Sequence, residues 1–100
     1  MDRTLLTADV VVAAMTAIAP FEFRDGRLHA ELAFPDFATA FAFMTAVAAD
    51  AEDLDHHPDW SNSHRRVTID LVTHSAGGVT AFDLELARRI CAREIGRAHV

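Results

Sequence analysis

Several features that define large classes of protein are scarce or missing in this sequence of 100 residues. Its single cysteine, Cys91, cannot form an internal disulfide, and the apolar helical context around it predicts a buried thiol. Acidic residues outnumber basic ones by 15 to 9, which argues against binding to nucleic acid or to an anionic membrane, because both need a basic face. No apolar run approaches the roughly 20 residues that span a bilayer, and we expect the chain to stay in the cytoplasm.

The short motifs of several common chemistries are missing as well. The chain contains no GxGxxG, GxxxxGK or GxSxG element, the usual signatures of nucleotide binding and of a nucleophilic serine. It also has no HxH, HxxxH or HExxH spacing, so zinc is disfavoured and we expect no metal and no other cofactor. Gly77-Gly78 before Thr80 could offer backbone N–H groups to an anion, although a plain turn explains these glycines equally well.

What the chain does contain is enough apolar material for one core. Hydrophobic residues make up 51% of it, and the length fits a single domain over residues 1–100. The apolar stretch at 10–19 ends in a sequence that mimics a signal-peptide cleavage site. Val11, Met15 and Ile18 follow helical spacing, however, and therefore favour an amphipathic first helix over a targeting segment.

The first half of the chain predicts a helix, a β-hairpin and a second helix. Thr7 suits the start of the first helix, which we expect to end near Pro20. Residues 21–34 alternate apolar and polar around Asp25-Gly26, the dipeptide of a tight type I′ turn, and predict a hairpin. A helical apolar period then runs from residue 36 to about 52, and we expect its phenylalanines in the core: Phe37, Phe41 and Phe43.

The second half predicts a strand and a final helix. Residues 53–63 have the composition of a polar loop, with a short strand at 59–63 as an alternative, and a strand is expected over about 64–73. Thr80 and Asp83 resemble a capping box at the start of the last helix. We expect the tail from residue 96 onward to be frayed.

This order of elements predicts an α+β fold. The economical arrangement is a two-layer sandwich, in which a small antiparallel sheet of three to four strands has its helices packed on one face. The outer face of such a sheet, or its edge strand, is a natural place for self-association.

Histidine is frequent, with six in the chain, and three stand near predicted turns: His56, His57 and His74. Pro58 favours an extended backbone at His57, so the side chains of the adjacent pair should point to opposite sides and would not easily share a metal. Imidazole donates and accepts protons near neutral pH, so the three could converge on a small polar substrate as general acids and bases. Ordinary surface histidines explain the same pattern equally well.

Two carboxylates precede the histidine pair. Glu52 and Asp55 lie within about one helical turn of it and could orient an imidazole or raise its pKa. The remaining histidines are expected to be exposed or interfacial, without a role in a site: His29, His64 and His99.

Several motifs around the histidines occur together in a specific order. Residues 52–60 read EDLDHHPDW, and a V-x-I-x-L pattern at 67–71, Thr73-His74 and a T-x-x-D helix start at 80–83 follow. An F-x-D-F…A-F-x-F-M segment precedes them at 34–44. Together these motifs resemble the pterin-4a-carbinolamine dehydratase family, over about residues 28–90.

The resemblance implies a lyase that removes water from 4a-hydroxytetrahydropterin to give quinonoid dihydropterin, without metal or redox cofactor. Such an enzyme recycles tetrahydrobiopterin beside an aromatic amino-acid hydroxylase, and its protomers pair through their sheets into homodimers or homotetramers. By the same resemblance, the catalytic residues would be His56, His57 and His74. Residues that line or support the pterin pocket would be Glu52, Pro58, Trp60, Thr73, Ser75, Ala76 and Asp83. A helix cap explains Asp83 equally well, and a core or interface anchor explains Trp60.

Two further functions are compatible with the same scaffold. Relatives of this fold act as protein-binding modules, either as the dimerisation partner of a homeodomain transcription factor or as assembly factors for large enzymes. Another pterin, such as a molybdopterin-related compound, is a third candidate as substrate. The sequence leaves open which pterin is physiological, whether the assembly is dimeric or tetrameric, and which histidine is the acid and which the base.

Overall fold

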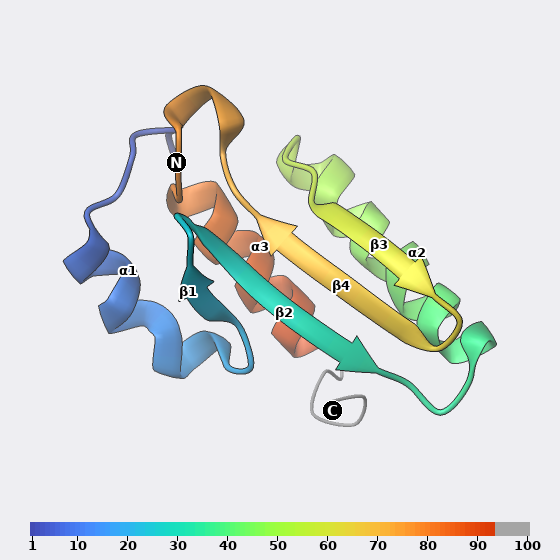
Figure 1. The fold of residues 1–100 in the computed structure, drawn as a ribbon. Coiled ribbons are helices and arrows are strands. Elements are labelled where there is room, and N and C mark those ends of the chain that lie inside the picture. Colours follow the sequence, from blue (N-terminus) through green and yellow to red (C-terminus); the bar gives the residue numbers. More distant parts are fainter. Residues whose placement is uncertain (94–100) are drawn as a thin grey trace.

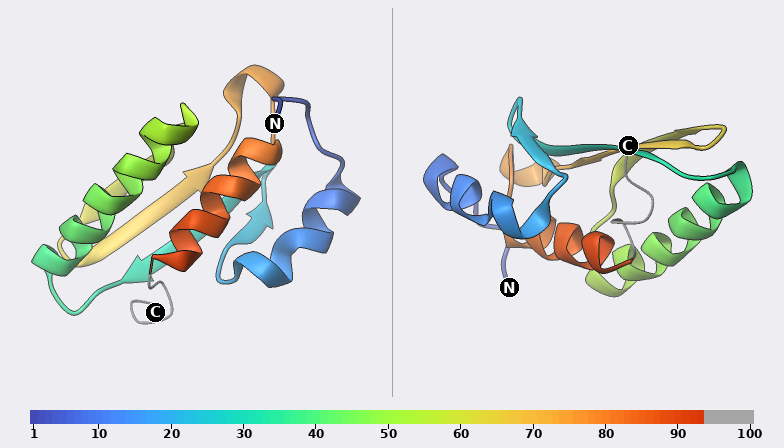
Figure 2. Two further views of the ribbon diagram at one scale, coloured as in Figure 1. Left: turned by 180° about the vertical axis from the view of Figure 1, so that it is seen from behind. Right: turned by 90° about the horizontal axis from the view of Figure 1, so that it is seen from below.

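The computed structural model describes residues 1–93, and these form one antiparallel sheet with all of their helices on the same face (Figure 1). Seen along the edge of the sheet, the strands form one layer and the helices the other (Figure 2). The strand order is β1-β2-β4-β3. The predicted α+β two-layer sandwich is therefore confirmed. Its elements are α1 (Ala8–Ala14), the 3₁₀ helix η1 (Met15–Ile18), β1 (Glu22–Arg24), β2 (Arg27–Ala33), α2 (Phe37–Leu54), β3 (Asp59–Ser63), β4 (Arg66–Leu71), the 3₁₀ helix η2 (His74–Ala76) and α3 (Ala81–Ala92).

The first helix is shorter than expected. The hydroxyl of Thr7 caps α1 by accepting a hydrogen bond from the N–H of Val10 at 3.4 Å, as predicted. The helix then ends at Ala14 and tightens into η1, which reaches Ile18, instead of running unbroken to Pro20. Such 3₁₀ turns are common at the ends of α-helices, and proline cannot continue the backbone hydrogen bonding.

The hairpin between β1 and β2 forms at the expected dipeptide. Asp25 and Gly26 both have positive φ, 53° and 75°, as a type I′ turn requires. Arg24 pairs with Arg27 directly across this turn, which fixes the register of the two strands. The register matters because it decides which side chains of β2 face away from the helices.

Helix α2 buries only one of its two apolar stripes. Phe37 and Phe41 are 48% and 56% exposed, and their ring centroids lie 5.8 Å apart, so the prediction that they belong to the core is wrong. The stripe with Phe37 and Phe41 is adjacent on the helix to a second apolar stripe. The sheet and α3, which lie beneath α2, cover only this second stripe. That buried stripe contains Ala40, Phe43, Val47, Ala51 and Leu54.

The segment predicted as a polar loop over 53–63 is largely regular. Residues 53–54 complete α2 and residues 59–63 form β3, so the loop prediction is wrong there and the alternative short strand is right. β4 spans 66–71 instead of 64–73. β3 is an edge strand with polar side chains on its exposed face, and it therefore lacks the apolar alternation by which strands are recognised.

The core lies between the inner face of the sheet and the helices. Cys91 was expected to be buried, but it is only half-buried, with its Sγ 3.4 Å from the carbonyl oxygen of Ala19. No helix among residues 1–93 is long and apolar enough to cross a membrane. The predicted fraying from residue 96 and the prediction for His99 lie outside the described residues. Among the fully buried core side chains are Val11, Ile18, Leu28, Leu32, Val47, Val67, Ile69, Leu71, Leu86 and Ile90.

Candidate active site

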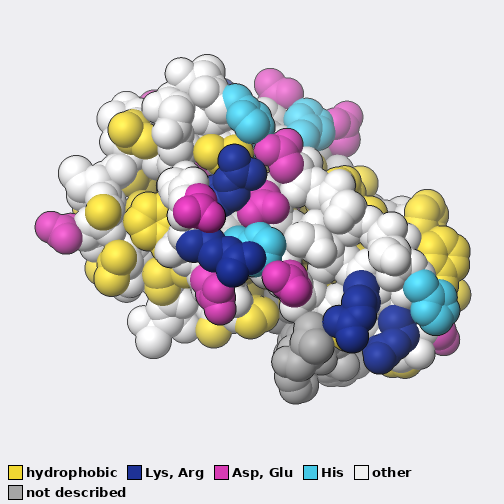
Figure 3. Space-filling model, viewed as in Figure 1, with side chains coloured by type: hydrophobic (Ala, Val, Ile, Leu, Met, Phe, Trp, Pro, Cys, Tyr) yellow, Lys and Arg dark blue, Asp and Glu magenta, His cyan; other side chains and the backbone are white. Residues whose placement is uncertain are grey.

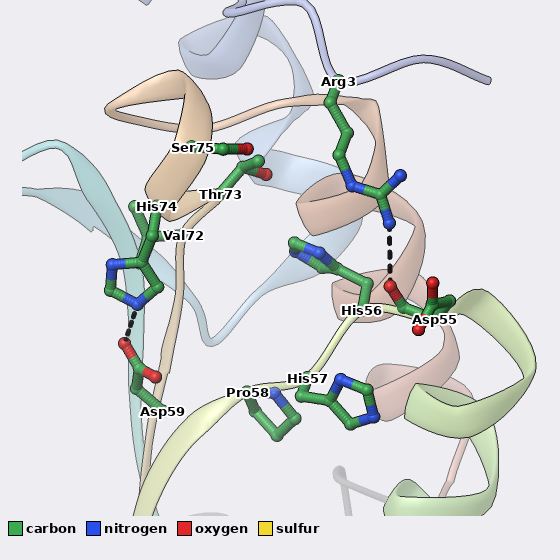
Figure 4. A pocket seen from close by; sticks show the side chains of 10 residues that line it. All are labelled: Arg3, Asp55, His56, His57, Pro58, Asp59, Val72, Thr73, His74 and Ser75. Atoms are coloured by element: carbon green, nitrogen blue, oxygen red, sulfur yellow. Dashed lines mark hydrogen bonds and ion pairs between the residues drawn. The ribbon is translucent and has the colours of Figure 1, made fainter.

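An open pocket of about 360 Å³ lies at the end of the sheet where α2 leads into β3 and β4 leads into η2 (Figure 4). Three separate segments build it: the N-terminal stretch, the connection from α2 to β3, and the chain leaving β4. All three predicted catalytic histidines line it. The lining residues are Arg3, Asp55, His56, His57, Pro58, Asp59, Val72, Thr73, His74 and Ser75.

The end of α2 sets the direction of the histidine pair. Asp55 adopts a left-handed conformation, with φ 50°, and its N–H and that of His56 bond back to carbonyls of the last helical turn. The chain then leaves the helix in an extended course through Pro58 into β3. The side chains of His56 and His57 consequently turn away from each other (Figure 4). Only His56 enters the protein interior.

His56 is held by a buried carboxylate. Its Nε2 lies 2.6 Å from Oδ1 of Asp83, whose exposed fraction is 0%. The other oxygen, Oδ2, accepts the hydroxyl of Thr73 and the N–H of Thr80, each at 2.8 Å. Asp83 is thus the N3 residue of the capping box that begins α3 and the anchor of His56 at once. It lies behind the pocket wall and does not line the pocket.

The other two histidines repeat the pairing at the surface. His57 Nε2 lies 2.5 Å from a carboxylate oxygen of Glu52, and His74 Nε2 lies 2.7 Å from Oδ2 of Asp59. These pairs are well exposed, with 56% of the His57 side chain and 71% of the His74 side chain open to solvent. Ionised carboxylates only accept hydrogen bonds, so Nε2 carries the proton in each pair and Nδ1 is the nitrogen able to take up another.

Arg3 enters the pocket from the N-terminal segment. A backbone hydrogen bond of 2.9 Å, from the N–H of Leu6 to the carbonyl of Val79, holds this segment against the loop that precedes α3. Its Nη2 donates to the backbone carbonyl of Asp55 at 2.8 Å. Its guanidinium also lies over the ring of Phe82, 4.1 Å from the centroid. No motif marks Arg3 in the sequence, and neither it nor Asp59 was predicted; the position of Asp59 directly after the HHP sequence was the only available signal.

The remaining predicted site residues are distributed around the pocket. Pro58, Thr73 and Ser75 line it, whereas Glu52 stands behind His57. Trp60 is half-buried and packs against the core, and Ala76 lies in η2 outside the lining. Among residues 1–93, no three His, Cys, Asp or Glu side chains gather closely enough to hold a metal ion.

The two histidines outside the pocket differ from each other. His64 is exposed in the turn between β3 and β4, as expected. His29 is not exposed, because only 13% of its side chain reaches solvent and both ring nitrogens contact carboxylates. Burial lowers the pKa of His29, but the hydrogen bonds to Glu31 and Asp70 raise this pKa by more than burial lowers it. The pKa therefore lies above its ordinary value.

Comparisons with known proteins agree on one family. The family model described as pterin 4 alpha carbinolamine dehydratase matches residues 4–92. A relative from Solibacter usitatus is 43% identical over 93 residues, which is 93% of this chain and 98% of the relative. Another from Mesorhizobium japonicum is 45% identical over 92 residues, 90% of this chain and 94% of the relative. Both carry the name pterin-4-alpha-carbinolamine dehydratase as a provisional one.

A solved structure is similar as well. The crystal structure of a protein from Brucella melitensis, described as a transcriptional coactivator/pterin dehydratase, has a TM-score of 0.83 and 42% sequence identity. The match covers 88% of this chain and 96% of that one.

Proposed function

The chain belongs to the pterin 4 alpha carbinolamine dehydratase family, and from this premise we propose that it dehydrates 4a-hydroxytetrahydropterin to quinonoid dihydropterin by histidine acid/base catalysis. The observation that carries the proposal is the set of three imidazoles around one pocket, each bonded through Nε2 to a carboxylate. The biological role would be recycling of a tetrahydropterin cofactor beside an aromatic amino-acid hydroxylase.

The reaction needs two proton transfers and one bond cleavage. A proton goes to the 4a-hydroxyl oxygen, the carbon–oxygen bond breaks, and water leaves. A ring nitrogen of the pterin gives up its proton, and the electron pair of that N–H bond forms the new double bond to carbon 4a. Nothing is oxidised or reduced overall, so paired histidines in complementary protonation states provide the required chemistry.

Each pocket element has a place in this proposal. His56, His57 and His74 transfer protons, and their carboxylate partners hold the rings in the tautomer that leaves Nδ1 unprotonated. The pterin ring would lie against Pro58 and the stretch 73–75, which line the pocket.

The direct test follows formation of quinonoid dihydropterin by absorbance. We expect the wild-type chain to exceed the uncatalysed rate and His74→Ala to lose about 10²- to 10⁴-fold in kcat, the usual contribution of one acid or base. His64→Asn is the matched control, since His64 lies in an exposed turn with φ 54° that asparagine tolerates. A wild-type rate equal to the uncatalysed one would refute the proposal.

One observation favours a second candidate function. The similar Brucella melitensis structure is described as a transcriptional coactivator as well as a dehydratase, so a protein-binding role on the same scaffold is a specific alternative. A pull-down that recovers one partner in stoichiometric amount, together with no turnover of any pterin in a substrate panel, would favour this alternative over catalysis.

We also propose that the chain forms a homodimer or homotetramer. Two features support this: β3 is an edge strand, and the paired rings of Phe37 and Phe41 lie on an exposed part of α2 that carries no charged residue between positions 37 and 49. Sedimentation equilibrium measures the mass in solution, and a mass of 11.0 kDa at micromolar concentration would contradict self-association.

A further inference from the structure

Four ionisable side chains form a row across the outer face of the sheet. Glu22 pairs with His29, His29 with Asp70, and Asp70 with Asp59, so the row crosses β1, β2, β4 and β3 in turn. All four belong to the outward-facing set of their strands, because the alternate residues are the more buried ones. Acidic, basic and histidine side chains gather in the middle of this face (Figure 3).

His29 is the one member of the row that can carry a positive charge. Its Nδ1 lies 2.8 Å from Oδ1 of Asp70 and its Nε2 lies 2.9 Å from Oε2 of Glu31. A ring that donates from both nitrogens is an imidazolium, so the contacts favour the charged form. Its pKa is raised in the same sense, since these hydrogen bonds outweigh the lowering by burial and by the charge of Arg24.

Asp59 connects this row to the candidate site. Its Oδ2 accepts from Nε2 of His74 at 2.7 Å, and it lines the pocket. Directly opposite it on β4 is Asp70, and residues that face each other across antiparallel strands have their Cβ atoms about 5 Å apart. Two carboxylates at this separation repel each other. Each of them also raises the proton affinity of the neighbouring imidazole.

We propose that His29 is a positioning residue for the pocket: as a cation bonded to Asp70, it offsets the negative charge beside Asp59 and thereby sets the proton affinity of His74. The consequence of the His29 charge for turnover rests on the proposed function, whereas the effect of that charge on His74 does not. Other ionisable groups also face the two rings. Beside His29 these are Glu22 and Arg24 from β1 and Glu31 from β2. Around the pocket of His74 they are Arg3, Asp55, His56 and His57.

The expected size follows from the spacing of the strands. Two strand spacings separate His29 from Asp59, about 10 Å. A unit charge at that distance in a water-like dielectric changes a titration midpoint by about 0.3 pH unit. Removal of the cation should therefore raise the midpoint of His74, the partner of Asp59, by up to about 0.3 unit, and removal of the anion at Asp70 should lower it.

The experiment is a pH titration of the histidine ring C–H signals by NMR, at low ionic strength and without substrate. Wild type is compared with His29→Gln, which removes the charge, His29→Lys, which keeps a cation, and Asp70→Asn, which removes the opposing anion. We expect the midpoint of His74 to rise in His29→Gln, to return towards wild type in His29→Lys and to fall in Asp70→Asn. In 0.5 M salt the differences should shrink, since the screening length is then well below 10 Å.

The opposite signs separate a charge effect from a structural one. A general loosening of the sheet would move His74 in the same direction in His29→Gln and Asp70→Asn, and that result overturns the proposal, as does an unchanged midpoint in both. Asp70→Asn provides an independent arm if His29→Gln does not fold by circular dichroism. A further outcome is that the midpoints move as expected while neither the wild type nor any variant turns over pterin. In that case the electrostatic coupling between His29 and His74 stands and the proposed dehydratase function fails.

Discussion

Replacing Asp83 with asparagine exchanges one buried carboxylate oxygen for an NH₂ group with little change in volume, yet it acts on both the fold and the candidate site. The carboxylate accepts three hydrogen bonds: from Nε2 of His56, from the hydroxyl of Thr73 and from the N–H of Thr80. An asparagine oxygen can still accept the bonds of the two threonines. Its NH₂ group would then face His56 as a donor.

The cost in stability can be worked from these bonds. A hydrogen bond to a charged group contributes about 1.5–3 kcal/mol and a neutral one about 0.5–1.5 kcal/mol, so each surviving bond loses about 1 kcal/mol. Two bonds give about 2 kcal/mol, a large share of the 5–15 kcal/mol that is typical of a folded domain. The matched control is Asp53→Asn, whose carboxylate is 70% exposed and bonds only to Arg89 among the described residues. That exposed pair should contribute about 0.2–1 kcal/mol.

The same substitution inverts the tautomer of His56. Facing a donor, Nε2 must become the acceptor, and the proton moves to Nδ1. The free nitrogen is then a donor, so a base at this position is lost, and we expect kcat/KM to fall by about 10²- to 10⁴-fold. Asp53→Asn should keep wild-type turnover.

Two measurements check this reasoning. Urea unfolding can be followed by the fluorescence of Trp60, the one tryptophan, and gives the free energies of both variants. Pterin turnover gives the rates. Equal losses of stability in Asp83→Asn and Asp53→Asn would refute the claim that the buried carboxylate anchors the cap and His56 together. A full rate in Asp83→Asn would refute the tautomer argument while leaving the stability argument intact.

Three further outcomes follow from the structure. Arg3→Ala should raise KM more than it lowers kcat, with only partial recovery in Arg3→Lys, because a lysine loses the planar contact with Phe82; steady-state kinetics decide this, and unchanged KM contradicts it. Burial raises the pKa of the Cys91 thiol, so iodoacetamide should label it more slowly at pH 7.5 in the folded chain than in urea, and equal rates by mass spectrometry would count against that shift. The folded-state pKa of His29 lies above its ordinary 6.5, so its contribution to stability is complete below that pH and is lost as the pH rises through the folded-state pKa. The stability difference between wild type and His29→Gln, measured by urea unfolding, should accordingly narrow as the pH rises above 6.5, and a difference that widens would contradict the sign.

The local sequence predicted the parts of the fold that depend on neighbours along the chain. The hairpin turn at Asp25-Gly26 and the cap by Thr7 need only nearby backbone groups, and both form as expected. The predictions failed where burial decides. Phe37 and Phe41 follow the same helical period as the buried stripe of α2, and only the position of the sheet determines which stripe is covered.

The candidate site divides in the same way. Its three histidines could be identified from the sequence, because the HHP and TH motifs are local and their chemistry is intrinsic to imidazole. Their carboxylate partners could be identified only in part. Glu52 lies five residues from His57 on the same end of α2, whereas Asp83 is 27 residues from His56 and meets it only because α3 packs beside α2.

The sequence by itself therefore determined the fold class, the hairpin and the helix caps at Thr7 and Thr80, since these follow from side-chain type and short-range spacing. The tertiary structure alone decided that Arg3 reaches the pocket, that each of the three pocket imidazoles faces a carboxylate, and that Asp59 links His74 to the row of charges that contains His29. Those contacts join residues far apart in the chain, and the register of the strands and the packing of the helices, which no local pattern encodes, bring them together.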